Sequence, residues 1–209
     1  MLRHRLIFGT VLAAAMLAIL VGDAGLGPWY PCLLGCVVLA AVPAVRELVR
    51  LFPADVRPPL GLCLPAVLAV LLANWAPVVS GVPPWPVLAT VVAVSVIVAF
   101  LVEMSRYDGS GRSTPRVANA AFCVAYLGLL PSFFVQLRWL PDVSGLALTL
   151  AVFVPKCCDI GAYTTGRLIG RTPFSPRLSP KKTWEGIAGG MVFAVLTAVG
   201  LSFAGPVFR

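Results

Sequence analysis

Polar residues that could bind phosphate or a metal ion are concentrated in one stretch, residues 156–190. It contains two carboxylates, Asp159 and Glu185, and six Lys or Arg residues. Mg²⁺ prefers carboxylate, water and phosphate oxygens, and cations neutralise phosphate charge. The stretch therefore indicates a site for a phosphorylated substrate. The alternative is a loop that is basic only because it faces the cytoplasm.

Asp159 follows an apolar run that is too short to cross a membrane. Leu146–Val154 has about nine residues, whereas a span needs about 20. We therefore expect the helix to continue through Lys156 and Asp159, with Tyr163 on the same face one turn later. An acid at the inner interface is a functional-site hypothesis by default, and the alternative is a Lys156–Asp159 pair that makes insertion tolerable. Three glycines would allow another helix or a ligand to approach closely: Gly161, Gly166 and Gly170.

The motif Ser179-Pro180-Lys181-Lys182 predicts the start of a further helix. Ser is a good N-cap, and Pro is favoured as the first helical residue. The two lysines would then lie in the first turn, where cations are unfavourable for the helix itself. A phosphate bound between the lysines and the positive end of the helix would explain why the two cations lie there. Glu185, just before the last apolar run, could bind a metal or pair with a lysine.

The composition places these residues in a membrane protein. The chain has 209 residues, of which 59% are hydrophobic and 11% charged, and its mean hydropathy is +0.95. Soluble domains are about 45–50% apolar and about 25% charged. The sequence thus excludes a disordered chain, a collagen-like chain and a typical soluble domain. The only histidine, His4, argues against a histidine-dependent zinc site and a Ser/His triad.

Seven apolar segments predict an all-α, polytopic integral membrane bundle of about seven transmembrane helices. They are Leu6–Val21, Trp29–Val45, Leu60–Val79, Trp85–Met104, Val117–Leu137, a segment from near Gly145 past Val154, and Gly186–Phe203. We treat residues 1–209 as a single membrane domain. In it, 1–144 are N-terminal spans and 145–209 begin the region that carries the chemistry.

The cations predict the orientation of these spans. With the N-terminus in the cytoplasm, fourteen of the 16 Lys and Arg residues fall on the inner side, all except Arg138 and Arg209. This asymmetry is typical of the positive-inside rule. It accounts for most of the net charge of +8, so a nucleic-acid partner is not expected. The predicted location is the inner (cytoplasmic) membrane of the cell, as a multi-pass protein.

Polar side chains and cysteines inside the spans are expected to pack against neighbouring helices. Four polar residues are expected to form interhelical hydrogen bonds or to lie at an interface: Asn74, Ser95, Asn119 and Gln136. The six cysteines include no Cys-x-x-Cys. We expect them to act as small apolar packing residues rather than disulfides or metal ligands.

Residues 159–190 resemble the phosphatidate cytidylyltransferase (CDP-diacylglycerol synthase) family. The matching residues are Asp159-Ile160-Gly161-Ala162-Tyr163, Gly166-Arg167 with Gly170, and Ser179-Pro180-Lys181-Lys182-Thr183-Trp184-Glu185-Gly186 with Gly189-Gly190. The resemblance implies that CMP is transferred from CTP to phosphatidic acid, giving CDP-diacylglycerol and pyrophosphate with Mg²⁺ as cofactor. It also implies membrane lipids as partners, leaves a homodimer open, and gives no role to nucleic acid.

The resemblance also implies roles for individual residues. Asp159, Lys182 and Glu185 would be catalytic, and Asp159 and Glu185 would bind the metal. The residues implied in substrate binding are Tyr163, Arg167, Ser179, Lys181 and Thr183. Of the two lysines, Lys182 matches the family lysine, whereas Lys181 falls on a variable position.

The sequence departs from this family at its C-terminal side. The family's Ser-x-x-Lys-Arg run, Lys-Asp, His-Gly-Gly and Asp-Arg are not found in these 209 residues. We therefore expect a truncated member that is inactive or very weak by itself. Two other functions stay open. One is a CTP-dependent lipid kinase of the polyprenol or phytol type, which shares a Lys-x-x-Glu-Gly pattern. The other is a non-catalytic membrane transporter or scaffold.

Overall fold

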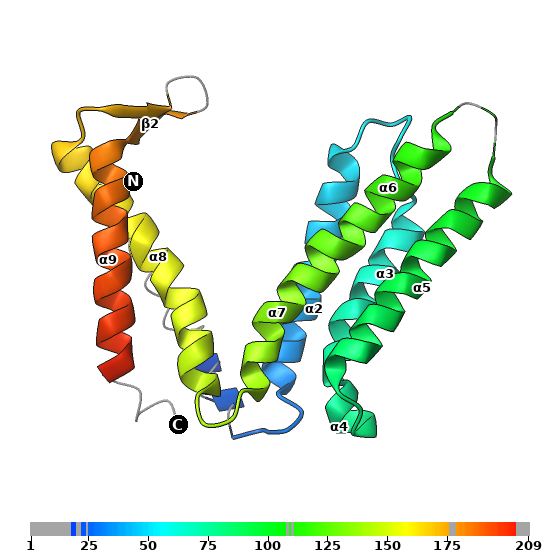
Figure 1. Cartoon of the computed structure of the whole chain (residues 1–209), viewed down its shortest axis with the longest axis horizontal. Helices are drawn as coiled ribbons and strands as arrows, with labels where there is room; N and C mark the ends of the chain where they lie inside the picture. Colours follow the sequence, from blue (N-terminus) through cyan, green and yellow to red (C-terminus); the bar gives the residue numbers. More distant parts are fainter. Residues whose placement is uncertain are drawn as a thin grey trace. The chain divides into compact units, whose positions relative to one another are not determined.

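The computed structural model describes residues 25–203 except 108, 110 and 176–178, together with residues 18, 19, 22 and 23. Its helices are α2 (Pro31–Leu51), α3 (Leu60–Leu72), η1 (Ala73–Trp75), α4 (Ala76–Ser80), α5 (Pro84–Ser105), α6 (Ser113–Val124), η2 (Ala125–Leu129), α7 (Leu130–Gln136), η3 (Leu137–Trp139), α8 (Ser144–Ile169) and α9 (Trp184–Phe203). Its strands are β1 (Pro173–Ser175) and β2 (Ser179–Thr183). The all-α prediction is confirmed, with one short hairpin added (Figure 1).

Six helical stretches of the described chain are long and apolar enough to cross a membrane. Four are single helices, α2, α5, α8 and α9, and two are composites, Leu60–Ser80 and Ser113–Trp139. They confirm the second to the seventh predicted spans. The first predicted span, Leu6–Val21, lies almost entirely outside the described residues. The chain is a polytopic membrane protein.

The chain divides into two compact units, which we describe separately. The N-terminal unit comprises residues 22–136, and the C-terminal unit contains residues 137–203. In Figure 1 the first runs from blue to green, and the second from yellow to red. The boundary between them lies shortly before α8.

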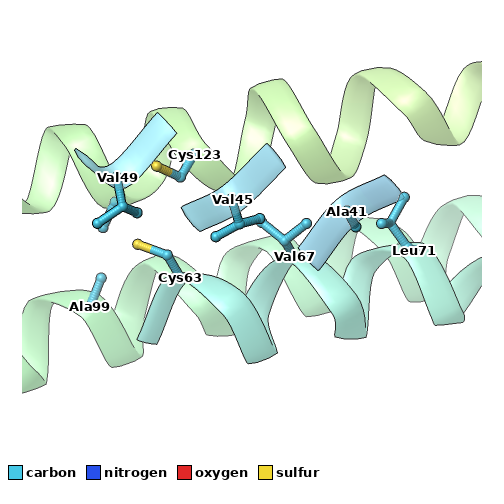
Figure 2. Packing of buried hydrophobic residues seen from close by; sticks show 9 residues of the cluster. Ala41, Val45, Val49, Cys63, Val67, Leu71, Ala99 and Cys123 are labelled. Atoms are coloured by element: carbon cyan, nitrogen blue, oxygen red, sulfur yellow. The ribbon is translucent and has the colours of Figure 1, made fainter. Parts of the chain in front are cut away.

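The core of the N-terminal unit is built from residues spaced four apart. On α2 these are Ala41, Val45 and Val49, and on α3 they are Cys63, Val67 and Leu71. Rows with this spacing form ridges that pack into the grooves of a neighbouring helix. Ala99, Ala120 and Cys123 complete the cluster (Figure 2). The packing role predicted for the cysteines is confirmed for Cys63 and Cys123.

Polar side chains inside this unit bond to one another across helices. Asn74 is fully buried, and its amide nitrogen donates to the Ser132 hydroxyl at 2.8 Å. The Gln136 amide nitrogen donates to the Asn74 amide oxygen at 2.7 Å. The interhelical hydrogen bonding predicted for Asn74 and Gln136 is therefore confirmed. Ser95 instead bonds within its own helix, to the carbonyl of Val91.

An ion pair connects α5, α6 and the loop before α3. Glu103 is only 6% exposed, and its carboxylate accepts a hydrogen bond from Arg116 at 3.1 Å. Arg116 also donates to the carbonyl of Asp55, and Asn119 donates to that of Val56. This pair was not predicted from the sequence. Glu103 is the one acid within the predicted span Trp85–Met104, and an acid in such a position indicates a buried partner.

Candidate active site

Helix α8 carries the first group of predicted site residues. It is continuous from Ser144 to Ile169, so the prediction that it runs on through Lys156 and Asp159 is confirmed. Both of these side chains are exposed. Within the described part of the chain, Asp159 forms no hydrogen bond or ion pair, and the alternative of a Lys156–Asp159 pair is not observed. The Asp159 carboxylate is thus available to a ligand.

Glycines bring α9 close to α8. A side chain added at Gly186 would lie 2.9 Å from the Ala162 carbonyl oxygen, and one at Gly190 would lie 3.0 Å from that of Cys158. One added at Gly161 would collide with Phe193. Small residues four apart permit close backbone packing between membrane helices. The predicted close approach at Gly161 is therefore confirmed, and the partner is helix α9 (Figure 1).

The motif that follows α8 folds as a hairpin, which corrects one prediction. Strands β1 and β2 pair antiparallel, with Pro173 opposite Thr183 and Ser175 opposite Ser179. The predicted helix start at Ser179 is therefore wrong, because Ser179–Thr183 are extended and α9 begins at Trp184. The local signal of Ser followed by Pro was overridden by pairing with β1. A helix N-terminus at Ser179 consequently offers no phosphate site.

Thr183 performs the capping role that the sequence had assigned to Ser179. Its hydroxyl oxygen accepts a hydrogen bond from the backbone N–H of Gly186 at 3.2 Å, as an N-cap side chain does. The same hydroxyl would lie 3.1 Å from a side chain added at Gly166 of α8. Thr183 therefore sits where the hairpin, the end of α8 and the start of α9 meet.

Glu185 connects the first turn of α9 to the chain that leaves α8. Its carboxylate accepts hydrogen bonds from the backbone N–H groups of Arg171 and Thr172 at 3.2 Å, and from the Thr172 hydroxyl at 2.9 Å. These bonds hold the base of the hairpin. The carboxylate thus has an observed structural role. The metal-binding role expected for it stays a prediction.

The cationic side chains lie at the surface of the same unit. Lys181 and Lys182 are both exposed on β2. The register of the hairpin shifts between the Pro173–Thr183 and Ser175–Ser179 pairs, so Lys181 and Lys182 lie in the irregular part of β2. On α8, the Arg167 guanidinium donates to the Tyr163 hydroxyl at 3.0 Å, and both side chains are exposed. Ser179 starts β2, at the far end of the strand from Thr183.

Asp159 and Glu185 lie at different levels of the α8–α9 pair. Asp159 lies beside Cys158 on α8, and the Cys158 carbonyl faces Gly190 on α9. Glu185 precedes Gly190 by five residues, which corresponds to about 7.5 Å along α9. A single ion bound directly by both acids would need oxygens about 2.0–2.1 Å away. Among the described residues, no three His, Cys, Asp or Glu side chains form a metal-binding cluster. An ion held by either acid would therefore need substrate oxygens and water to complete its coordination shell.

The fold and the exposed residues together define a class of protein. It is a multi-span membrane protein in which two helices pack closely through glycines and carry carboxylates, and a cationic hairpin connects them. The model of the cytidylyltransferase family matches residues 3–207, so the chain belongs to that family.

Several curated phosphatidate cytidylyltransferases are similar to this chain. The protein from Mycobacterium leprae is 32% identical over 130 residues, which cover 54% of this chain and 41% of the relative. That from Aquifex aeolicus is 37% identical over 79 residues, 37% of this chain and 30% of the relative. That from Pseudomonas aeruginosa is 42% identical over 65 residues, 30% of this chain and 24% of the relative. The matches thus span less than half the length of each of these relatives.

Proposed function

We propose that this chain binds CTP and phosphatidic acid at its C-terminal unit, for the transfer of CMP that yields CDP-diacylglycerol and pyrophosphate. The observation that carries the proposal is the folding of α8, the two hairpin strands and α9 into one unit. Asp159 and Arg167 are exposed on α8 and Lys182 is exposed on β2, and the glycine contacts and the hydrogen bonds of Glu185 connect these elements. Membership of the cytidylyltransferase family and the names of the relatives support it.

The chemistry requires charge neutralisation more than covalent help. A phosphate oxygen of phosphatidic acid attacks the α-phosphorus of CTP, a new P–O bond forms, and the bond to the β-phosphate oxygen breaks so that pyrophosphate leaves. Developing negative charge is stabilised by fixed cations. Lys182 and Arg167 would hold phosphate oxygens, and Tyr163 would orient Arg167 through their hydrogen bond.

The carboxylates would have different tasks in this reaction. Mg²⁺ would bring neutralising charge to the triphosphate, and the free Asp159 carboxylate is its first candidate ligand. Glu185 could bind the ion only through the carboxylate lone pairs that its present hydrogen bonds do not use. Its main effect would be to hold the hairpin in place. Thr183, Ser179 and Lys181 would support substrate binding at the hairpin.

Lysine footprinting with mass spectrometry tests whether this surface binds CTP. The purified chain is treated with an amine-acetylating reagent, with and without CTP and Mg²⁺. We expect CTP with Mg²⁺ to protect Lys182 more than Lys181, since Lys182 matches the lysine of the family motif and Lys181 falls on a variable position of it. Lack of protection at both lysines, or equal protection by ATP, would contradict the proposed site.

The reaction products distinguish a cytidylyltransferase from a lipid kinase. With CTP labelled at the α-phosphate, a cytidylyltransferase transfers the label to lipid and releases unlabelled pyrophosphate. A kinase that uses CTP leaves that label in CDP. We expect labelled lipid.

Two finer properties belong to the same proposal. The distribution of cations favours the inner (cytoplasmic) membrane, with the hairpin on the cytoplasmic side. Accessibility of a cysteine introduced into the hairpin, in intact cells and in inverted vesicles, tests that orientation. A homodimer stays a prediction, which light scattering on the detergent-solubilised protein would test.

A further inference from the structure

A groove of about 600 Å³ runs between α3 and α5 in the N-terminal unit. Its α3 side is lined by Pro59, Gly61 and Ala66, and its α5 side by Val94 and Val98. A side chain added at Gly61 would meet nothing within 4 Å, so the space beside this residue is open. The volume falls in the range of about 300–1,000 Å³ typical of sites for small molecules.

The groove follows the part of both helices that lies within a membrane. Helices α3 and α5 belong to two of the stretches that are able to span it. On α5 the groove extends from Val94 to Arg106, about 18 Å at about 1.5 Å per residue. Half of a hydrocarbon core about 30 Å thick is about 15 Å. The groove thus reaches from one interface to about the middle of the bilayer, the depth that one acyl chain occupies.

Arg106 places a positive charge at the interfacial end of this groove. It directly follows α5, lines the groove and is exposed. In the described portion of the chain, no Asp or Glu forms an ion pair with Arg106. A guanidinium above an apolar groove complements a phosphate above an acyl chain.

We propose that this groove binds an anionic membrane phospholipid. One acyl chain lies along α3 and α5, and the headgroup phosphate accepts hydrogen bonds from Arg106. The bound lipid covers an apolar face and links the two helices at the interface. The site lies wholly in the N-terminal unit and does not depend on the function proposed for the C-terminal unit.

Native mass spectrometry of the full chain in detergent tests the proposal with two defined lipids. Dioleoylphosphatidylglycerol is the anionic probe, and dioleoylphosphatidylcholine is its zwitterionic control. We expect the chain to bind the anionic lipid about fivefold more tightly. Arg106→Gln should abolish this preference and Arg106→Lys should keep most of it. Arg112→Gln, in the same polar loop but outside the groove, should leave it unchanged.

Filling the groove provides a second, independent variant. Gly61→Leu places a side chain in the open space, and Gly35→Leu on α2 is the matched control, because a side chain added there also meets nothing within 4 Å. Gly61→Leu should lower the binding of both lipids, whereas Gly35→Leu should not. An unchanged preference in Arg106→Gln, or equal binding by the two glycine variants, would overturn the proposal. So would a change in dimer content in Gly61→Leu with lipid binding intact, because the groove would then hold a second copy of the chain.

Discussion

The interior polar groups of the N-terminal unit and the exposed groups of the candidate site in the C-terminal unit differ in their bonding. In the N-terminal unit, Glu103 is paired with Arg116, and Asn74 bonds to Ser132 and Gln136. In the C-terminal unit, Asp159 and Lys182 are exposed on a helix and a strand that are packed firmly at their base. Polar groups bonded inside a membrane bundle stabilise it, whereas those left available at an interface can bind ligands.

This difference separates two kinds of experimental outcome. A substitution of a bonded interior polar group in the N-terminal unit should change stability and leave CTP protection at the hairpin intact. A substitution of an exposed cation in the C-terminal unit should do the reverse. Each variant below therefore needs both measurements, thermal unfolding in detergent and CTP footprinting.

Arg116→Leu should have the largest effect, on stability. It removes the bond to the Asp55 carbonyl and the partner of the buried Glu103, and a buried charged group left without its partner costs about 3 kcal/mol. Thermal unfolding should show this loss, and the double variant with Glu103→Leu should recover much of it. Arg112→Leu is the control, and its free energy of unfolding should change by about 0.5 kcal/mol or less. A double variant as unstable as the single one would show that the pair is not the cause.

Lys182→Gln should have the next largest effect, on CTP binding rather than stability. A hydrogen bond to a charged group contributes about 1.5–3 kcal/mol, so the affinity for CTP should fall about 10- to 100-fold. Lys181→Gln, at the variable position of the motif, should reduce it about threefold or less. CTP titration of the purified variants measures both values. Equal losses for the two lysines would indicate general charge attraction without a specific site.

Most of the helical fold could be predicted from the sequence, because a membrane span depends mainly on the length of an apolar run. A run of about 20 apolar residues must form a helix in lipid, since each backbone group needs an internal partner. The extension of α8 through Asp159 followed from the same argument, by length alone. The Glu103–Arg116 pair did not, because its partners are thirteen residues apart on different helices and nothing in their spacing connects them.

The residues of the candidate site stay a prediction, and its local structure differs from the one expected from the sequence. The motif Ser179-Pro180 carries a valid helix-start signal, yet the chain uses Thr183 as the cap and pairs Ser179–Thr183 with β1. Hairpin pairing depends on residues in both strands, and the Ser179-Pro180 motif alone contains no information about the partner strand. The bonds of Glu185 to the Arg171 and Thr172 amides were missed for a similar reason, because they use backbone groups that no side-chain pattern records.

Gly186→Ala should have a smaller effect, on stability and through it on the hairpin. The added methyl group would lie 2.9 Å from the Ala162 carbonyl oxygen and 3.2 Å from the Gly166 backbone, which forces α8 and α9 apart. Overpacking of this kind costs about 1–3 kcal/mol. Gly200→Ala, in open space on the same helix, should be neutral or stabilising by about 0.5–1 kcal/mol. Thermal unfolding of both variants checks the difference in sign, and a stabilised Gly186→Ala would contradict the close packing.

Thr183→Ala should have the smallest effect on stability, about 1 kcal/mol, because it removes one N-cap hydrogen bond. Thr197→Ala is the matched control, since its hydroxyl bonds only to the Phe193 carbonyl of its own helix. Hydrogen exchange at the Gly186 amide should quicken in Thr183→Ala and stay slow in Thr183→Ser, which keeps the hydroxyl. If Thr183 acts only as a cap, CTP protection of Lys182 should recover in Thr183→Ser together with the slow exchange. Slow exchange without recovered protection would instead mean that Thr183 contacts the nucleotide, so the surface between hairpin and helix pair would be part of the binding site itself.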